Sequence, residues 1–323
     1  IKKIFIEELL HQPKLELCGT SESTILPVEE LLFSKPDFVF IDCALYEIEK
    51  GILRNLLEEL PNITIFMLCD FLNEHEIQMA TKALCLGVAD CFQKPMELDP
   101  IAVQNFKTKL LNKLNTWPIN KSSSVNKIKP LENFEFSQKY EIITLFCSTG
   151  GFFSLMQILP FLPKNFPIPI LINIQLPKVF SKSFLEKINQ VSHLYIKEAK
   201  DGDTLTPSSV YLIFRNTNLK ILNSKPKKSL SITSVTSNEH KTFFRAIVET
   251  YGSKAVAVIL SGDGFDLTEE MQNFKQQGGL VILQDETTSI LWKNAKLIYE
   301  FNLFDMILPP EEIVEKLCQL AWV

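Results

Sequence analysis

A serine followed by two glycines, in the run Phe146-Cys-Ser-Thr-Gly-Gly151, is the first candidate for chemistry in this sequence. The apolar residues before Ser148 are typical of a strand, and residues 152–159 have helical spacing, which predicts a strand-to-helix turn at the serine. Backbone amides at such a turn suit an anion or an oxyanion. The run differs from the G-x-S-x-G elbow of hydrolases, so helix capping stays open beside nucleophilic catalysis.

Asp42, Cys69 and Lys94 form a second group of candidates, because each comes at or just after the end of a short apolar segment. In an open α/β sheet the functional crevice lies at the carboxyl ends of the strands, so we expect these side chains to meet at one edge. An acid and a lysine there are either a reactive pair or a structural ion pair.

The elements that must position these side chains are short apolar segments that alternate with helical spacing. The first half predicts helices over 1–12, 27–33, 47–60, 73–86 and 100–115, and strands over 15–18, 37–41, 63–68 and 89–92. The second half predicts strands over 140–146, 168–174, 194–197, 210–214, 219–222, 255–261 and 280–284, and helices over 152–159, 180–191, 239–251 and from 311. Such alternation predicts the α/β class, with two doubly wound parallel-sheet domains.

A change of composition separates the two halves. Residues 116–138 contain Pro118, three consecutive serines, Pro130 and several lysines without periodicity, which is typical of a linker. We therefore expect a first domain over 1–115 and a second over 139–323. Ile1 already lies within helical spacing and no helix start precedes it, so we expect an element upstream of it.

Composition narrows the classes of function. The chain has 323 residues, 46% of them hydrophobic and 22% charged, as in soluble globular proteins. Its net charge of -5 argues against nucleic-acid binding. The seven cysteines form no C-x-x-C pair, so we expect reduced thiols and a cytoplasmic location. No apolar run approaches the roughly 18 residues of a membrane-spanning helix, and no signal peptide is visible, so membrane insertion is not expected.

The runs Asp37-Phe-Val-Phe-Ile-Asp42 and Cys91-Phe-Gln-Lys94-Pro95 resemble the phosphoacceptor strand and the Lys-Pro turn of response-regulator receiver domains. The resemblance implies a flavodoxin-like fold, Asp42 as phosphoacceptor, Lys94 as a ligand of the phosphoryl group and a cis Lys94-Pro95 bond. Receivers bind Mg²⁺ through an acidic pair at the end of their first strand, and this chain starts after that point. We therefore expect a receiver-like domain without its first strand or metal site.

Two further receiver positions are altered. Cys69 stands at the usual hydroxyl switch position, where it still donates weakly, and Cys91 stands at the usual aromatic position. We expect no phosphorylation of this chain, although a phosphoacceptor and a plain Asp42–Lys94 pair both remain open.

Five segments of the second half, 148–151, 177–184, 198–203, 259–266 and 278–286, resemble in order and spacing the chemotaxis receptor methylesterases of the CheB family. The resemblance implies a Rossmann-type α/β domain whose Ser-His-Asp triad hydrolyses glutamate methyl esters, and often deamidates glutamines, on chemoreceptor helices. It implies no cofactor for this domain. The implied partners are chemoreceptor cytoplasmic helices, other chemotaxis proteins and, through the first domain, a histidine kinase.

By that resemblance Ser148 matches the nucleophile, Asp266 matches the acid that orients the histidine, and Thr149, Gly150 and Gly151 form the oxyanion turn. Two positions depart from the pattern. Gln175 occupies the place of the histidine, and an amide cannot take a proton near neutral pH. Asp263 replaces a methionine whose backbone amide helps to form the oxyanion hole, and its carboxylate would repel a developing oxyanion. Esterase activity is expected to be weak or lost.

Other reactive groups are weaker candidates. Asp263 could act as the base if burial raised its pKa. Cys147 could be a nucleophile, but strand alternation turns it toward the packed side. His193 could be a displaced base, although all four histidines are expected to lie away from the Gln175 loop. The alternative to a weak esterase is a non-catalytic pseudoenzyme that binds or regulates chemotaxis or two-component proteins.

Overall fold

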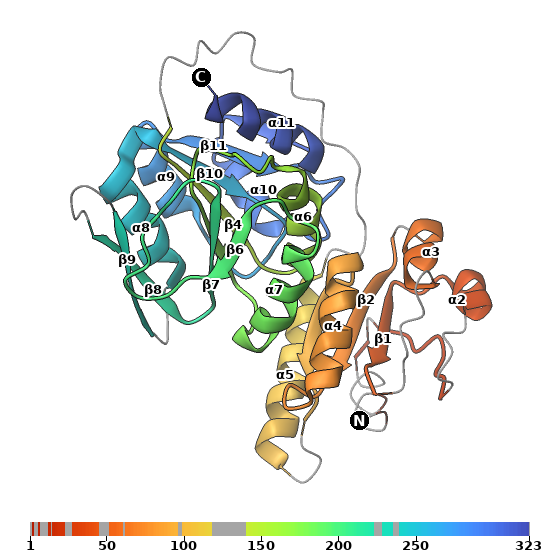
Figure 1. Cartoon of the computed structure of the whole chain (residues 1–323). Helices are drawn as coiled ribbons and strands as arrows, with labels where there is room; N and C mark the ends of the chain where they lie inside the picture. Colours follow the sequence, from red (N-terminus) through yellow and green to blue (C-terminus); the bar gives the residue numbers. More distant parts are fainter. Residues whose placement is uncertain are drawn as a thin grey trace. The chain divides into compact units, whose positions relative to one another are not determined.

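The computed structural model describes residues 2, 6, 12–13, 15–22, 28–44, 52–60, 62–95, 99–117, 140–222, 228–234 and 239–322 (Figure 1). The chain divides into two compact units, Ile1–Ser122 and Ser123–Val323. Most of the predicted linker, residues 118–138, lies outside the described residues.

The first unit is built on a parallel sheet in the order β1-β2-β3. The strands are β1 (Phe38–Asp42), β2 (Thr64–Cys69) and β3 (Asp90–Gln93), and the described helices are α2 (Val28–Ser34), α3 (Ile52–Glu59), α4 (Glu74–Leu86) and α5 (Pro100–Thr116). Every residue of the central strand β2 is buried, as expected of a strand covered on both faces. Asp99 caps α5 by accepting the backbone N–H of Ile101 at 2.9 Å, which confirms the predicted helix start.

One predicted strand of this unit is wrong. Residues 15–18 form no strand. In the flavodoxin-like order this segment would pair with a strand upstream of it, and the described residues contain no such strand. Without a neighbouring strand, its backbone N–H and C=O groups have no sheet hydrogen bonds to form. The predicted helix over 1–12 lies largely outside the described residues.

The second unit contains a seven-stranded, entirely parallel sheet in the order β12-β11-β10-β4-β5-β7-β6. Its strands are β4 (Ile142–Cys147), β5 (Ile170–Ile174), β6 (Tyr195–Glu198), β7 (Ser209–Phe214), β10 (Ala255–Ile259), β11 (Leu280–Gln284) and β12 (Met306–Leu308). The chain first builds the sheet on one side of β4 and then returns to its other side at β10. The topological switch point therefore lies between β4 and β10, where α/β sheets bind ligands.

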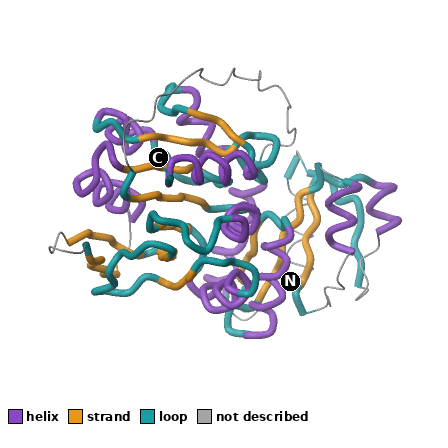
Figure 2. Tube along the Cα trace, turned by 45° about the horizontal axis from the view of Figure 1, so that its top comes forward, coloured by secondary structure: helices purple, strands orange, loops and turns teal. Residues whose placement is uncertain are grey.

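Helices cover both faces of this sheet, and the chain trace in Figure 2 shows the layers. They are α6 (Gly151–Ile158), α7 (Ser181–Asn189), α8 (Glu239–Tyr251), α9 (Thr268–Gln276), α10 (Lys293–Glu300) and α11 (Pro310–Ala321). Side chains of α8, α9 and α10 share one core with the strands. On α6 and α7, the rings of Phe152 and Phe184 stack with centroids 3.9 Å apart. The predicted α/β class is confirmed.

Residues 219–222, predicted as a strand, belong to β8 (Thr217–Leu222), which pairs antiparallel with β9 (Ser229–Ser234) in a separate two-stranded sheet. Sequence patterns did not indicate four elements of this unit: β9, β12, α9 and α10. Their apolar faces are short, which hides the periodicity on which such predictions depend.

Candidate functional site

Ser148 lies where the sequence predicts it, between the end of β4 and the start of α6 at the switch point of the sheet. Its side chain is only 3% exposed. The backbone N–H of Ser148 donates to the carbonyl of Ser261 at 3.1 Å, and its own carbonyl accepts the N–H of Gly151 at 2.8 Å. These bonds tie the turn after β4 to the loop after β10.

The hydroxyl of Ser148 hydrogen-bonds the backbone of Asp263. Its Oγ accepts the Asp263 N–H at 2.7 Å and donates to the Asp263 carbonyl at 3.0 Å. The Oγ1 of Thr149 donates to Oδ1 of the Asp263 carboxylate at 2.7 Å. The N–H that would stabilise an oxyanion is therefore present, but a carboxylate lies beside the same turn.

Glycines make this close approach possible. Gly150 has a φ of 78°, which favours glycine, and a Cβ there would lie 2.6 Å from Oγ of Ser261. A Cβ on Gly262 would lie 2.2 Å from Oγ of Ser148. Asn294, which the sequence analysis missed, fixes the second loop: its Oδ1 accepts the N–H of Phe265 at 3.2 Å, and its N–H donates to Gly262 at 3.1 Å.

Gln175 follows β5 and is 5% exposed. Its backbone N–H donates to the carbonyl of Cys147 at 2.8 Å, which places it beside Ser148 in the ladder. Its Nε2 donates to Oδ1 of Asn173, and its Oε1 is buried without a hydrogen-bond partner among the described residues. The side chain of Gln175 is thus a buried, neutral amide that is engaged with Asn173.

Asp266 is exposed, and its hydrogen bonds within the described chain go to Thr268. Its Oδ1 accepts the Thr268 hydroxyl at 2.6 Å and the Thr268 N–H at 3.0 Å. The hydroxyl bond is the largest cause of a lowered Asp266 pKa. Asp266 therefore orients the start of α9 and forms no hydrogen bond with Gln175 or Ser148.

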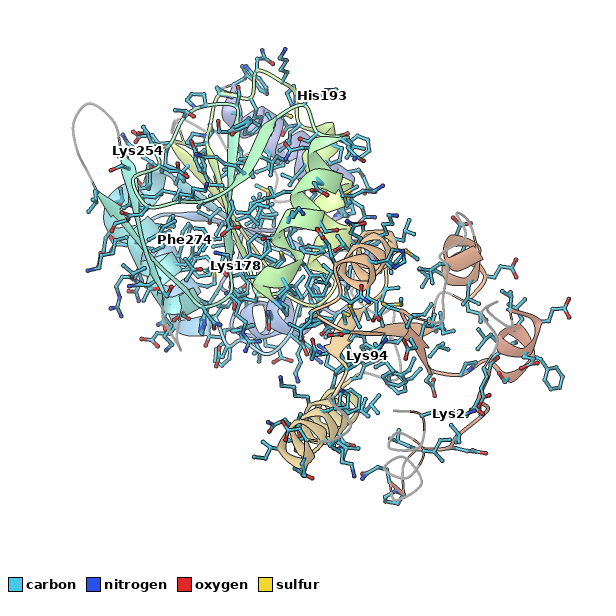
Figure 3. All side chains as sticks on the ribbon, turned by 60° about the horizontal axis from the view of Figure 1, so that its bottom comes forward. Lys2, Lys94, Lys178, His193, Lys254 and Phe274 are labelled. Carbon is cyan, nitrogen blue, oxygen red and sulfur yellow. The ribbon has the colours of Figure 1, made fainter. Side chains whose placement is uncertain are left out.

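One histidine, His240, lies beside the loop that follows β10 and carries Phe265 and Asp266. Its ring packs edge-to-face on Phe265 with centroids 5.1 Å apart, and its charge contributes to lowering the pKa of Asp266. His193 is exposed and precedes β6, at the amino end of the sheet (Figure 3). Ser148 lies at the carboxyl end, so His193 is no displaced base. Cys147 is fully buried, which raises its thiol pKa and removes it as a nucleophile.

In the first unit, Lys94 pairs with two carboxylates, as expected for Asp42 and unforeseen for Glu76. Its Nζ lies 2.5 Å from Oδ1 of Asp42 and 2.8 Å from Oε2 of Glu76. Burial alone would lower the pKa of Lys94, but the two carboxylates outweigh it and raise that pKa. Asn73-x-x-Glu76 is a helix-start signature that could have drawn attention to Glu76, which also accepts the N–H of Asp70 at 2.8 Å.

Cys69, at the end of β2, and Cys91, within β3, are both buried. In the described part of the chain, no group of three or more His, Cys, Asp or Glu side chains could hold a metal ion. None of the described helices is long and apolar enough to span a membrane.

Known proteins resemble this chain over nearly its whole length. Residues 143–317 match the family model described as CheB methylesterase. A protein-glutamate methylesterase/protein-glutamine glutaminase of Thermotoga maritima is 30% identical over 322 residues, covering 96% of this chain and 92% of that protein. One from Desulfotalea psychrophila is 26% identical, covering 98% and 94%. The crystal structure of the Thermotoga maritima CheB methylesterase catalytic domain matches with a TM-score of 0.54 and 33% identity, over 57% of this chain and all of that domain.

Proposed function

Because the chain belongs to the CheB methylesterase family, we propose that it acts in chemotaxis signalling as a methylesterase-fold protein that has lost ester hydrolysis. The observation that carries the proposal is Gln175. Its backbone N–H pairs with the carbonyl of Cys147, the residue before Ser148, while its side-chain amide donates to Asn173 and cannot accept a proton near neutral pH. In comparable triads, loss of the histidine costs roughly 4 to 6 orders of magnitude in rate.

What remains is suited to binding. The relatives are named for chemistry on glutamate and glutamine in proteins, and the fold and the Ser148 turn are retained here. We therefore propose the cytoplasmic helices of chemoreceptors as ligands of the second unit, bound without turnover. A histidine kinase is the partner that a receiver-like first unit would meet.

Methanol release from a methylated receptor fragment tests this proposal. The natural chain should release methanol no faster than its Ser148→Ala variant, while both bind the fragment with similar affinity. Appreciable turnover that Ser148→Ala abolishes would show that an enzyme survives here.

Weak hydrolysis is the second candidate, and two contacts favour it. The Asp263 N–H still reaches Oγ of Ser148 at 2.7 Å, and His240 supplies an imidazole near Asp266. If any turnover is found, His240→Ala tests whether His240 is the base that takes the serine proton. Loss of that turnover assigns the base to His240, whereas unchanged turnover assigns it to water.

For the first unit we propose that Asp42 is a structural partner of Lys94 rather than a phosphoacceptor. Lys94 holds Asp42 and Glu76 together, so the Asp42 carboxylate is already paired with a cation. Incubation with a small phosphodonor and Mg²⁺ should leave the mass of the chain unchanged. A mass increase that is absent from Asp42→Ala would contradict this.

A further inference from the structure

Three buried cysteines lie on neighbouring strands of the first-unit sheet: Cys43 directly after β1, Cys69 at the end of β2 and Cys91 within β3. Their exposed fractions are 2%, 0% and 9%. Because β2 lies between β1 and β3, Cys69 is the central one of the three, and all three are free of disulfides.

Strand register decides which two sulfurs can be joined. The N–H of Cys43 donates to the carbonyl of Leu68 at 2.8 Å and continues the β1–β2 pairing, in which Asp42 faces Leu68. Cys43 consequently faces Cys69 across neighbouring strands, which lie about 4.8 Å apart. That spacing falls within the Cα separation of roughly 4.4–6.8 Å that disulfides adopt.

Cys91 does not meet this condition. It is in register with Met67, two residues before Cys69 on β2. Strand geometry then separates the Cα atoms of Cys91 and Cys69 by about 8 Å. A disulfide between them would need backbone movement, because its limit is about 7 Å.

The surroundings also distinguish the roles of the two facing thiols. Hydrogen bonds from Cys43, and next from Cys91, lower the pKa of Cys69. The interaction with Cys69 and burial raise the pKa of Cys43. Cys69 is thus the more acidic thiol, and the thiolate is the form that attacks an oxidant.

We propose that Cys69 and Cys43 form a redox site that a hydroperoxide converts to an intramolecular disulfide. The Cys69 thiolate attacks one peroxide oxygen, breaking the O–O bond to give a sulfenic acid and an alkoxide, or hydroxide from hydrogen peroxide, which takes a proton. The Cys43 sulfur then attacks the sulfenic sulfur, forming the S–S bond and releasing water with the Cys43 proton. The two sulfurs lose two electrons, and the peroxide gains them.

The bond would fix the end of β1, which carries Asp42, to the end of β2 beside the Lys94 ion pairs. A metal centre is the competing use for three thiols, but no group of described side chains has the arrangement to hold an ion. Cys69 is fully buried, so the rate is set by opening of this edge and the reaction needs hours rather than seconds.

Hydrogen peroxide treatment of the full native chain, followed by mass spectrometry, tests the proposal. Before alkylation the intact monomer should lose about 2 Da, the mass of two hydrogens; after unfolding, alkylation and digestion it should yield a linked peptide pair containing Cys43 and Cys69. Cys43→Ser and Cys69→Ser should abolish the link, and Cys91→Ser should retain it. Cys318→Ser, which removes a more exposed thiol in the second unit, is the matched control and should retain it as well.

Should Cys43→Ser disturb folding, Cys43→Ala takes its place for a second measurement. In a folded Cys43→Ala variant a sulfenic-acid probe should label Cys69, because no facing thiol remains to resolve the intermediate. The proposal fails if the native monomer keeps its mass, if the link passes through Cys91, if only intermolecular bonds through the exposed Cys18 form, or if oxidation occurs only in denaturant.

Discussion

The two candidate sites differ in the contacts that hold them. Around Ser148 the contacts are those of the backbone: the glycine turn, the Asp263 N–H and the closely approaching Gly262 surround the hydroxyl. At the end of β1 the contacts are between charged side chains, since Lys94 is bound to both Asp42 and Glu76.

The difference shows two ways in which packing fixes a candidate site. Ser148 is held by backbone hydrogen bonds and is almost fully buried, so its surroundings contribute to folding whether or not it reacts. At the end of β1, removing Asp42 or Lys94 would leave the other charge without that partner in a half-buried place.

The largest expected effect on stability is in the second unit, where Gly150→Ala should lower the free energy of unfolding by about 3 kcal/mol. The new Cβ meets Oγ of Ser261 at 2.6 Å and Cβ of Ile290 at 2.7 Å, in addition to its strained φ of 78°. Chemical denaturation measures the change.

Gly264→Ala is the matched control, because its φ of 85° carries the same strain and a Cβ there meets nothing within 4 Å. It should cost only about 1 kcal/mol. Equal losses at the two glycines would mean that the close packing of the Ser148 turn contributes nothing.

In the first unit, Lys94→Met should cost about 2 kcal/mol, because it leaves two carboxylates without their cation. The cost is below that of a fully buried pair since the Asp42 side chain is 24% exposed. The control is Lys178→Met, which removes a pair with Glu198 at 2.6 Å whose lysine is 68% exposed and should cost under about 0.5 kcal/mol. Similar losses of unfolding free energy in the two variants would show that the ion pairs of Lys94 stabilise the chain no more than an exposed surface pair does.

The smallest effect concerns Asp266. Its pKa is lower in the folded chain than in the unfolded chain, so ionised Asp266 adds stability above its unfolded pKa, which is lost as the pH falls through the folded value. Thr268→Val removes the main cause and should flatten the pH dependence of unfolding in the acid range. An unchanged acid profile would indicate that another group holds Asp266.

Sequence patterns predicted the structural features that depend on residues adjacent in the sequence. The Ser148 turn follows from an apolar strand running into glycines, and the α5 start follows from Asp99-Pro100. The predicted strand over 15–18 is absent because a strand is stable only when it pairs with a neighbouring strand. The Asn173–Gln175 contact and the Glu76–Lys94 pair depend on packing that no local pattern records.

His240 was missed although topology contains the signal. α8 connects to β10, a strand that runs toward the Ser148 edge, so α8 must run back the other way and begin at that edge. Its first turn is therefore near the loops that follow β4 and β10. Because the direction of the strands also fixes the direction of the helices between them, the topology places His240, in the first turn of α8, near the loop that carries Phe265.

Restoring the replaced side chains tests most directly whether chemistry was lost at the side chains while the backbone site survived. Gln175→His, alone and with Asp263→Met, should raise methanol release from a methylated receptor fragment by about 10²–10⁴-fold over the natural chain. The double variant should be the faster, and Ser148→Ala added to it should abolish the gain. A folded double variant that stays as inert as the natural chain would contradict the account.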